Sequence, residues 1–281
     1  GYDKDYAVAV TAGSSMLSPI IPPSIAMILY SYYTEIPVSR LFLGGIAPGL
    51  AIAALQMLWN RIEYSRRGYN IPTHPFSLRR LAGTLKRSIG ALLMPLIIIG
   101  GIISGIVTAT ESGVIAIVYG LFYGFFISKK LKPRDLISIL KNSAVTTAVV
   151  MITIAATGAL SNVLVRMRFQ ANVTDYVVNV IANPVLGTLF LMFVIFVLGM
   201  FLDPTVLIAM LAATILSIGN SFGFDPIHYG VVMVIMMQVG AITPPVGSFL
   251  FVSCGIAKLP IDRAVKPLLP FIVTIMVTIL L

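Results

Sequence analysis

Charged residues are scarce in this sequence. Only 10% of its 281 residues are Asp, Glu, Lys or Arg, whereas 58% are hydrophobic. Soluble domains carry about 25% charged residues, so the composition excludes an ordinary soluble protein and indicates an integral membrane protein. Uncharged stretches of about 18 to 20 residues match the length that a helix needs to cross a bilayer, and they lack the alternation of β-barrel strands.

Cysteine and histidine are almost absent. The single cysteine, Cys254, excludes an intramolecular disulfide, and His74 and His228 have no further cysteine with which to form a transition-metal set. We therefore expect no redox chemistry, no transition-metal site and no cofactor.

Acidic residues are fewer than basic ones, and the formal net charge is +9. A basic chain can bind nucleic acid. Here, however, the Lys and Arg residues gather in two short segments beside hydrophobic spans, residues 60–88 and 129–141. The positive-inside rule gives this distribution to cytoplasmic loops. We therefore expect a lipid bilayer and no nucleic acid as partner, and we place both segments in the cytoplasm.

The chain contains the same interrupted hydrophobic segment twice. Residues 18–24 read SPIIPPS and residues 240–246 read GAITPPV, and a shift of 222 positions that aligns the two proline pairs also aligns Asp3 with Asp225. Unwound backbone at membrane depth is tolerated only beside protein or a cavity. Proline-broken segments at corresponding positions of two halves therefore indicate a transporter and its binding site.

The basic segments also orient the repeat. Counting spans away from them puts Asp3 in the cytoplasm and Asp225 outside, so the two copies are inverted and alternating access follows. Residues 89–128 lie between the two cytoplasmic segments and must enter the membrane and return. They form either two full spans or a re-entrant hairpin with its polar tip at 108–112, and a tip that contains a glutamate favours a protein-lined hairpin.

We predict an all-α, inverted-repeat membrane transporter with Pro-broken helices and a re-entrant hairpin. We divide the chain at these features. The chain opens inside one copy of its own repeat, so we expect it to be the C-terminal part of a longer polypeptide. The parts are a first broken helix and the following span (1–59), a basic cytoplasmic linker (60–88), the hairpin (89–128), a cytoplasmic segment with a scaffold helix and an external arm (129–183), and repeat 2 with the C-terminal span (184–281).

Each proline pair removes two backbone donors, so nearby carbonyls lose their helical partners. Free carbonyls together with Ser and Thr hydroxyls suit a weakly hydrated cation such as Na⁺, although a simple helix kink is the alternative. The predicted cation ligands at the breaks are Ser18, Ile21, Gly240, Thr243 and Gly247. The residues predicted to bind or gate the substrate are Pro22, Pro23, Ser24, Pro244, Pro245 and Ser248.

Two carboxylates interrupt apolar segments. A carboxylate inside the membrane is costly unless it is paired, so Glu111 is a functional candidate by default. We predict that Thr108, Thr110 and Glu111 bind the cation and that Ser112 contacts or gates the substrate. Glu111 could instead cap the helix that follows. Asp203 precedes Pro204, where an N-cap is the favoured reading and gating the alternative.

Together these motifs resemble the large membrane subunit of tripartite ATP-independent periplasmic (TRAP) transporters. The motifs that carry the resemblance are Gly1-Tyr2-Asp3, Ile21-Pro22-Pro23-Ser24-Ile25, Gly100-Gly101-Ile102, Thr110-Glu111-Ser112, Gly199-Met200-Phe201-Leu202-Asp203-Pro204 and Thr243-Pro244-Pro245-Val246-Gly247. The resemblance implies a bacterial or archaeal inner-membrane protein that imports an organic acid with a Na⁺ gradient. It also implies a small membrane subunit, a periplasmic substrate-binding protein, and an elevator motion of a transport domain against a scaffold.

The resemblance matches the family's second hairpin tip to residues 108–112. The usual Thr-Pro-Thr-Glu of that tip has Ala109 in place of proline here. The family's first hairpin is expected upstream of Gly1.

Other functions stay open from the residues alone. One alternative is a Na⁺- or H⁺-coupled carboxylate carrier that works without a binding protein. A membrane-embedded enzyme would have to use Glu111 and Asp203 as acid and base, and the sequence offers no nearby His or Ser-Lys pair to assist them. A purely structural membrane subunit would have no evident use for an inverted repeat of broken helices.

Overall fold

The computed structural model describes residues 2–69 and 77–280, and within them the chain consists of helices joined by short connections. Five helices in this part are long and apolar enough to cross a membrane, or six if the bent pair Leu78–Lys86 and Ser88–Ile103 forms one span. The predicted all-α membrane class is confirmed. Residues 70–76 of the basic linker, including His74, lie outside the described residues.

The chain divides into two compact units. Unit 1 consists of residues 1–70 and 156–281, and unit 2 consists of residues 71–155. The division falls inside one long helix, α6 (Pro133–Arg166). The two broken segments both belong to unit 1, whereas the tip at 108–112 belongs to unit 2.

Unit 1 contains the sequence repeat as a structural repeat. In each copy a half-helix, a break and a second half-helix are followed by a longer helix with a proline in its interior, Pro48 in the first copy and Pro270 in the second. The first copy is α1 (Lys4–Ser15), α2 (Ile25–Thr34) and α3 (Val38–Arg66), and the second is α10 (Pro226–Ile242), α11 (Ser248–Ala257) and α12 (Ile261–Leu280).

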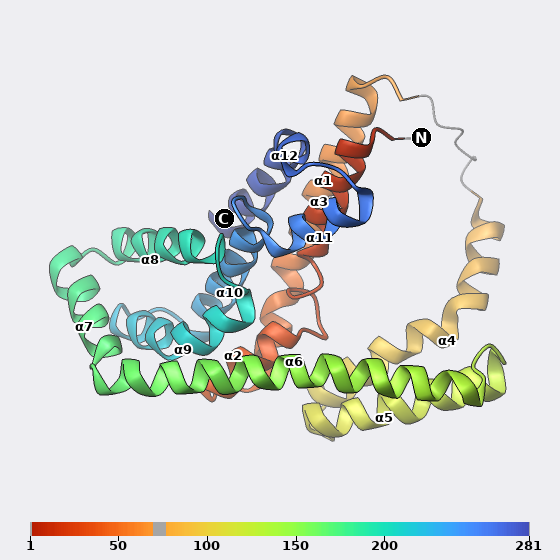
Figure 1. Ribbon diagram of the computed structural model, residues 1–281, viewed down its shortest axis with the longest axis horizontal. Helices are drawn as coiled ribbons and strands as arrows, with labels where there is room; N and C mark the ends of the chain where they lie inside the picture. Colours follow the sequence, from red (N-terminus) through yellow and green to blue (C-terminus); the bar gives the residue numbers. More distant parts are fainter. Residues whose placement is uncertain (1, 70–76, 281) are drawn as a thin grey trace. The chain divides into compact units, whose positions relative to one another are not determined.

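The two copies exchange contacts. Helix α1 packs on α11 and α12 of the other copy, and α10 packs in the same way on α2 and α3, while α3 and α12 contact each other (Figure 1). The aromatic rings at these contacts are fully buried: Phe271 lies over Gly13, and Tyr30 lies over Gly230. Burying large side chains between the copies stabilises them as one body, because each copy supplies the apolar surface that covers the other.

Three helices of unit 1 begin with an Asn or Asp followed by proline. The side-chain oxygens of Asn183, Asp203 and Asp225 accept hydrogen bonds from backbone amides in the first turns of α8 (Pro184–Gly199), α9 (Pro204–Ser221) and α10. Such caps satisfy amides that have no partner within the helix, and proline at the first helical position loses nothing. The sequence therefore sets the start of each of these helices.

Helices α8 and α9 form a hairpin. Helix α8 ends at Gly199 and is about 24 Å long at 1.5 Å per residue, short of a hydrocarbon core of about 30 Å, whereas α9 is one of the helices long and apolar enough to cross a membrane. The turn between the helices is only four residues, Met200–Asp203, and both helices pack on α10. The arm predicted between 166 and 183 is α7 (Phe169–Asp175) and a π-helical turn (Tyr176–Ile181), and both pieces pack on the hairpin.

Unit 2 contains a second pair of helices, α4 (Leu78–Ile103) and α5 (Ala109–Phe122), with a π-helical turn at Tyr123–Ile127. Two side chains join the pair: the Tyr119 hydroxyl donates to the Gly90 carbonyl at 2.7 Å, and the Ser112 hydroxyl donates to the Ile98 carbonyl at 3.1 Å. Helix α4 bends by 65° between Leu78–Lys86 and Ser88–Ile103.

The basic segments are more helical than we expected. Helix α3 continues to Arg66, α4 begins at Leu78, and α6 begins at Pro133, so much of 60–88 and 129–141 is helix. Lys and Arg are good helix formers. Hydropathy marks where a helix leaves the membrane, not where the helix ends.

The hairpin meets α10 at two glycines. A Cβ on Gly240 would lie 2.5 Å from the Cα of Gly199, and a Cβ on Gly199 would lie 3.1 Å from the Cα of Gly240. Real side chains do not tolerate the shorter distance, so the backbones approach this closely only because both residues are glycine. In contrast, a Cβ on Gly255 of α11 would meet nothing within 4 Å.

We predict that Gly240→Ala lowers the free energy of unfolding of the full-length protein in detergent by about 1–3 kcal/mol, the usual cost of overpacking. Gly255→Ala is the control and should raise it by about 0.5–1 kcal/mol, because alanine is the better helix former. Denaturant unfolding checks both values. Equal effects of the two substitutions would contradict the close packing of the hairpin on α10.

Candidate functional site

The second break separates α10 from α11 by five residues, Thr243–Gly247. Thr243 has an extended backbone, and the Pro244–Pro245 bond is cis, as is the Pro22–Pro23 bond of the first break. Gly247 has φ +49°, a left-handed conformation in which a Cβ would lie 2.9 Å from the Thr243 carbonyl oxygen. Glycine is therefore required at the point where the chain re-enters a helix.

Three carbonyls at this break have no hydrogen-bond donor in the described part of the chain. The Gly240 carbonyl accepts from the Thr243 amide at 2.9 Å, and the Val239 carbonyl accepts from the Thr243 hydroxyl at 2.7 Å. The carbonyls of residues 241–243 would need amides at positions 245–247, but Pro245 has none and the next two amides point elsewhere. Their oxygens remain available to a ligand.

The two remaining amides donate to the hairpin. Val246 and Gly247 both donate to the Met200 carbonyl, at 3.2 and 3.4 Å. This carbonyl belongs to the turn between α8 and α9, so the turn is fixed directly against the second break. The structure thus brings Gly240, Thr243 and Gly247 together with the turn Met200–Asp203.

Two buried side-chain oxygens flank the same break without a partner. The Oε1 atom of Gln238 lies one turn before the end of α10, and the Oγ atom of Ser248 lies in the first turn of α11; neither has a hydrogen-bond partner among the described residues. Ser248 was predicted from the sequence, but Gln238 was not. The signal that could have found it is a single amide in the otherwise apolar stretch of residues 229–242.

The first break is closed differently. Here the Ser24 hydroxyl donates to the Pro19 carbonyl at 2.5 Å and accepts from the Met27 amide at 3.1 Å, so it caps α2 from within the break. Ser24 is buried and Ser18 is exposed. The structure therefore gives Ser24 a capping role. The parts of Ser18, Ile21, Pro22 and Pro23 in a cation or substrate site stay predictions.

The tip at 108–112 lies in unit 2 and forms a capping box. Glu111 Oε2 accepts from the Thr108 amide at 2.7 Å and from its hydroxyl at 2.9 Å, and the Glu111 amide donates back to the Thr108 hydroxyl at 3.3 Å. Thr110 Oγ1 lies 3.1 Å from Thr108 Oγ1. The capping interpretation of Glu111 describes these bonds fully. Cation binding by Thr108, Thr110 and Glu111, and gating by Ser112, stay predictions.

Asp203 is an N-cap. Its Oδ1 accepts from the Thr205 amide at 2.8 Å, and the side chain is exposed. The capping alternative therefore accounts for its position, and its predicted part in gating is untested.

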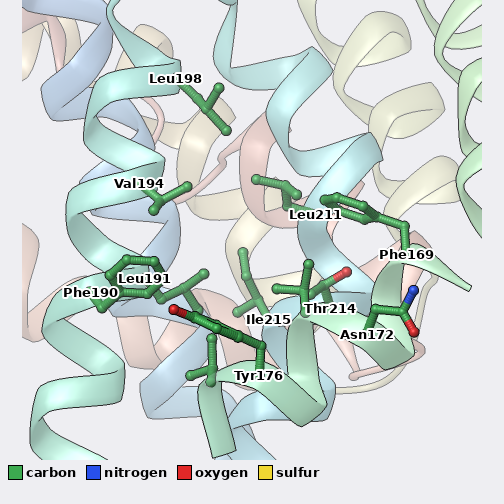
Figure 2. Close-up of a pocket in the computed structure, with 12 residues that line it drawn as sticks. Phe169, Asn172, Tyr176, Phe190, Leu191, Val194, Leu198, Leu211, Thr214 and Ile215 are labelled. Carbon is green, nitrogen blue, oxygen red and sulfur yellow. The ribbon is translucent and has the colours of Figure 1, made fainter. Parts of the chain in front are cut away.

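An apolar cavity of 320 Å³ lies between the arm and helices α8 and α9 (Figure 2). Its lining includes Phe169 and Tyr176 of the arm, Phe190 of α8 and Leu211 of α9. None of the predicted site residues lines it. Few polar groups face it, so it does not suit a charged solute, which would lose its hydration without compensation.

Comparison with known proteins identifies the family. All 281 residues match the family described as "Tripartite ATP-independent periplasmic transporter, DctM component". The chain belongs to this family. The resemblance stated from the sequence is thereby confirmed, and the chain is a multi-pass protein of the inner membrane.

Several curated relatives are similar along nearly the whole chain. The C4-dicarboxylate TRAP transporter large permease protein DctM of Vibrio cholerae is 34% identical over 293 residues, which cover 97% of this chain and 64% of the relative. The sialic acid TRAP transporter permease protein SiaT of Haemophilus influenzae is 33% identical over 100% of this chain and 46% of its own length. The 2,3-diketo-L-gulonate permease YiaN of Escherichia coli is 32% identical, with 98% and 64% covered.

The chain thus spans less than two thirds of the length of these relatives. All three are named as transporter permeases and not as enzymes, which argues against a membrane-embedded enzyme.

We predict that the two roles of Glu111 separate in two substitutions. Glu111→Ala removes the capping box and should lower the free energy of unfolding of the full-length protein by about 0.5–2 kcal/mol. Glu111→Gln keeps a capping-box residue and should keep that stability, but it removes the charge and should raise the Na⁺ concentration needed for half-maximal uptake. An unchanged Na⁺ requirement in Glu111→Gln would remove Glu111 from the cation ligands.

Proposed function

We propose that the full-length protein imports an organic acid across the inner membrane by secondary transport, driven by a Na⁺ gradient. The observation that carries the proposal is the second break, where three carbonyls without donors, the Thr243 hydroxyl and the unpartnered Ser248 hydroxyl border one stretch of backbone. Oxygen ligands of this kind replace the hydration shell of a weakly hydrated cation.

The helix ends at the break favour coupling of a cation to an anion. Helix α10 ends there, and the negative end of its dipole favours a cation. Helix α11 begins there at Ser248, and the positive end of its dipole favours a carboxylate. Opposite ends of two half-helices at one break therefore suit simultaneous binding of Na⁺ and an organic acid.

The hairpin α8–α9 supplies the movable wall of the proposed site. Its turn is held to the break by two backbone hydrogen bonds to the Met200 carbonyl, and a few such bonds can exchange without unfolding either helix. The inverted repeat gives unit 1 two exchangeable arrangements, so we propose an elevator-type motion of this unit.

We further propose a small membrane subunit and a periplasmic substrate-binding protein as partners. The family description and the names of the relatives support this tripartite arrangement. The substrates in those names, sialic acid, C4-dicarboxylates and 2,3-diketo-L-gulonate, are carboxylates, which supports the organic-acid class. The alternative is a carrier that needs no binding protein.

Uptake into proteoliposomes tests the proposal. The full-length protein and its small subunit are reconstituted without ATP, and uptake of radiolabelled organic acids is measured with and without an inward Na⁺ gradient and the binding protein. We expect uptake only when both are present. Uptake with Na⁺ alone would favour the simpler carrier, and uptake indifferent to Na⁺ would contradict the coupling.

We predict that Thr243→Ala raises the Na⁺ concentration for half-maximal uptake about tenfold, the change that corresponds to about 1.4 kcal/mol for one lost ligand. Thr278→Ala is a matched control, because Thr278 makes the same kind of bond, to the Thr274 carbonyl at 3.0 Å, and lies beside the opposite end of α10. The control should leave the Na⁺ requirement unchanged. Equal shifts in both variants would contradict the assignment of Thr243.

A further inference from the structure

A second cavity of unit 1 is basic. It has a volume of 370 Å³ and lies between α1, α3 and α12, at the end of these helices that the positive-inside rule places in the cytoplasm. Its lining residues are Asp5, Tyr6, Trp59, Glu63, Arg66, Arg67, Arg263, Lys266, Pro267 and Pro270. The cavity takes no part in the transport site described above.

Three of its four cations are unpaired. The Arg66, Arg263 and Lys266 side chains make no ion pair or hydrogen bond within the described residues. Arg67, in contrast, is fully engaged: its Nε donates to Glu63 at 2.7 Å, and its Nη1 lies 3.4 Å from Asp3 and 3.7 Å from Asp5.

Both acidic residues of the cavity, Asp5 and Glu63, therefore already form ion pairs with Arg67. The hydrogen bond to Glu63 is the main cause that raises the pKa of Arg67 above its usual value. The guanidinium also lies 4.8 Å above the Tyr6 ring. The remaining charge of the cavity is positive, which favours an anionic ligand.

Two further groups in the cavity have no partner. The indole N–H of Trp59 is buried without an acceptor, and the Oε2 atom of Glu63 is buried without a donor, in a residue that is only 9% exposed. A buried polar group without a partner costs free energy, so each of these side chains would gain a hydrogen bond if it turned toward a ligand in the cavity. The cavity thus offers cations, one donor and one acceptor together.

The surroundings place the cavity at the level of lipid headgroups. The rings of Tyr2, Tyr6, Tyr64 and Tyr69 contact one another at this end of α1 and α3. Clustered Tyr and Trp residues are typical of the membrane–water interface.

The corresponding cavity of the inverted repeat is not basic. It lies between α10, α3 and α12, has a volume of 510 Å³, and is lined mainly by apolar side chains, with Asp225 and His228 as its titratable residues. The fold therefore provides a cavity at both positions, and the residues that correspond to Arg263 and Lys266 under the shift of 222 are Leu41 and Gly44. The basic character is a property of these residues and not of the repeat.

We propose that the basic cavity binds the headgroup of an anionic phospholipid from the cytoplasmic leaflet. Arg66, Arg263 and Lys266 hold the phosphodiester. The Trp59 and Glu63 side chains turn toward the headgroup, so that the indole donates to a phosphate oxygen and Glu63 Oε2 accepts from a headgroup hydroxyl. Basic pockets between helices on the cytoplasmic side bind such headgroups. Phosphatidylglycerol, which combines one phosphodiester charge with hydroxyl donors, matches the set of groups.

Native mass spectrometry tests the site on the full-length protein with its small subunit. Phosphatidylglycerol, phosphatidylcholine and inorganic phosphate are each titrated against the wild type, Arg263→Gln/Lys266→Gln and a control of equal charge change, Lys130→Gln/Lys141→Gln, whose residues are exposed in unit 2. The readout is binding, so it does not depend on transport activity.

We expect the wild type to bind one phosphatidylglycerol. The affinity should be at least tenfold weaker in Arg263→Gln/Lys266→Gln and unchanged in the control. Phosphatidylcholine should not compete with it. Equal weakening in both variants, or no retained lipid in the wild type, would overturn the proposal. Competition by inorganic phosphate at the concentration of the lipid would overturn the lipid as occupant.

A milder variant keeps the test valid if the double variant does not fold. Trp59→Phe removes the indole N–H and keeps an aromatic ring, and we expect several-fold weaker binding of phosphatidylglycerol. Unchanged binding in Trp59→Phe would contradict the place given to the phosphate.

Discussion

The structure depends on one constraint: backbone polar groups inside a membrane need partners, and each proline pair removes two of them. The chain resolves the problem differently at its two breaks. At the first break, the Ser24 hydroxyl donates a hydrogen bond to the Pro19 carbonyl. At the second break, the Met200 carbonyl accepts hydrogen bonds from the amides of Val246 and Gly247, and the carbonyls of residues 241–243 have no donor among the described residues. Among the described residues the carbonyls of Ser18, Ile20 and Ile21 at the first break also have no donor. The second break is the better candidate for an ion because two buried side-chain oxygens without partners, those of Gln238 and Ser248, lie beside its free carbonyls.

The inverted repeat links the two broken segments to the rest of unit 1. Each half-helix of one copy packs on the other copy, so a shift at one break is transmitted to the long helices of both. The hairpin α8–α9 lies outside the six repeat helices. Its turn contacts the second break directly. The glycine contact between Gly199 and Gly240 fixes where the hairpin meets α10. Ion, substrate and hairpin thus converge on a few residues of unwound backbone.

The sequence was sufficient for the all-α class, the repeat, the N-cap at Asp203, and the family. These features depend on composition and on residues close together in the chain. The hairpin α8–α9 was not predicted, because both of its helices are apolar, and only the structure shows that α8 already ends at Gly199 and that both helices pack on α10. Gln238 was missed for a related reason, since a single amide gains meaning only when its burial without a partner is seen. The capping box at Glu111 was one of two interpretations that the sequence left open, and its geometry required the structure.

The most direct test of this account is equilibrium binding of ²²Na⁺ to the purified full-length protein and to its Pro244→Ala/Pro245→Ala variant. The substitutions return two amides that can donate to the carbonyls of Gly240 and Ala241, so the helix should continue through the break. The account predicts that saturable Na⁺ binding is lost while the protein stays folded, as judged by its circular dichroism. Unchanged Na⁺ binding in the variant would show that the broken backbone is not the cation site.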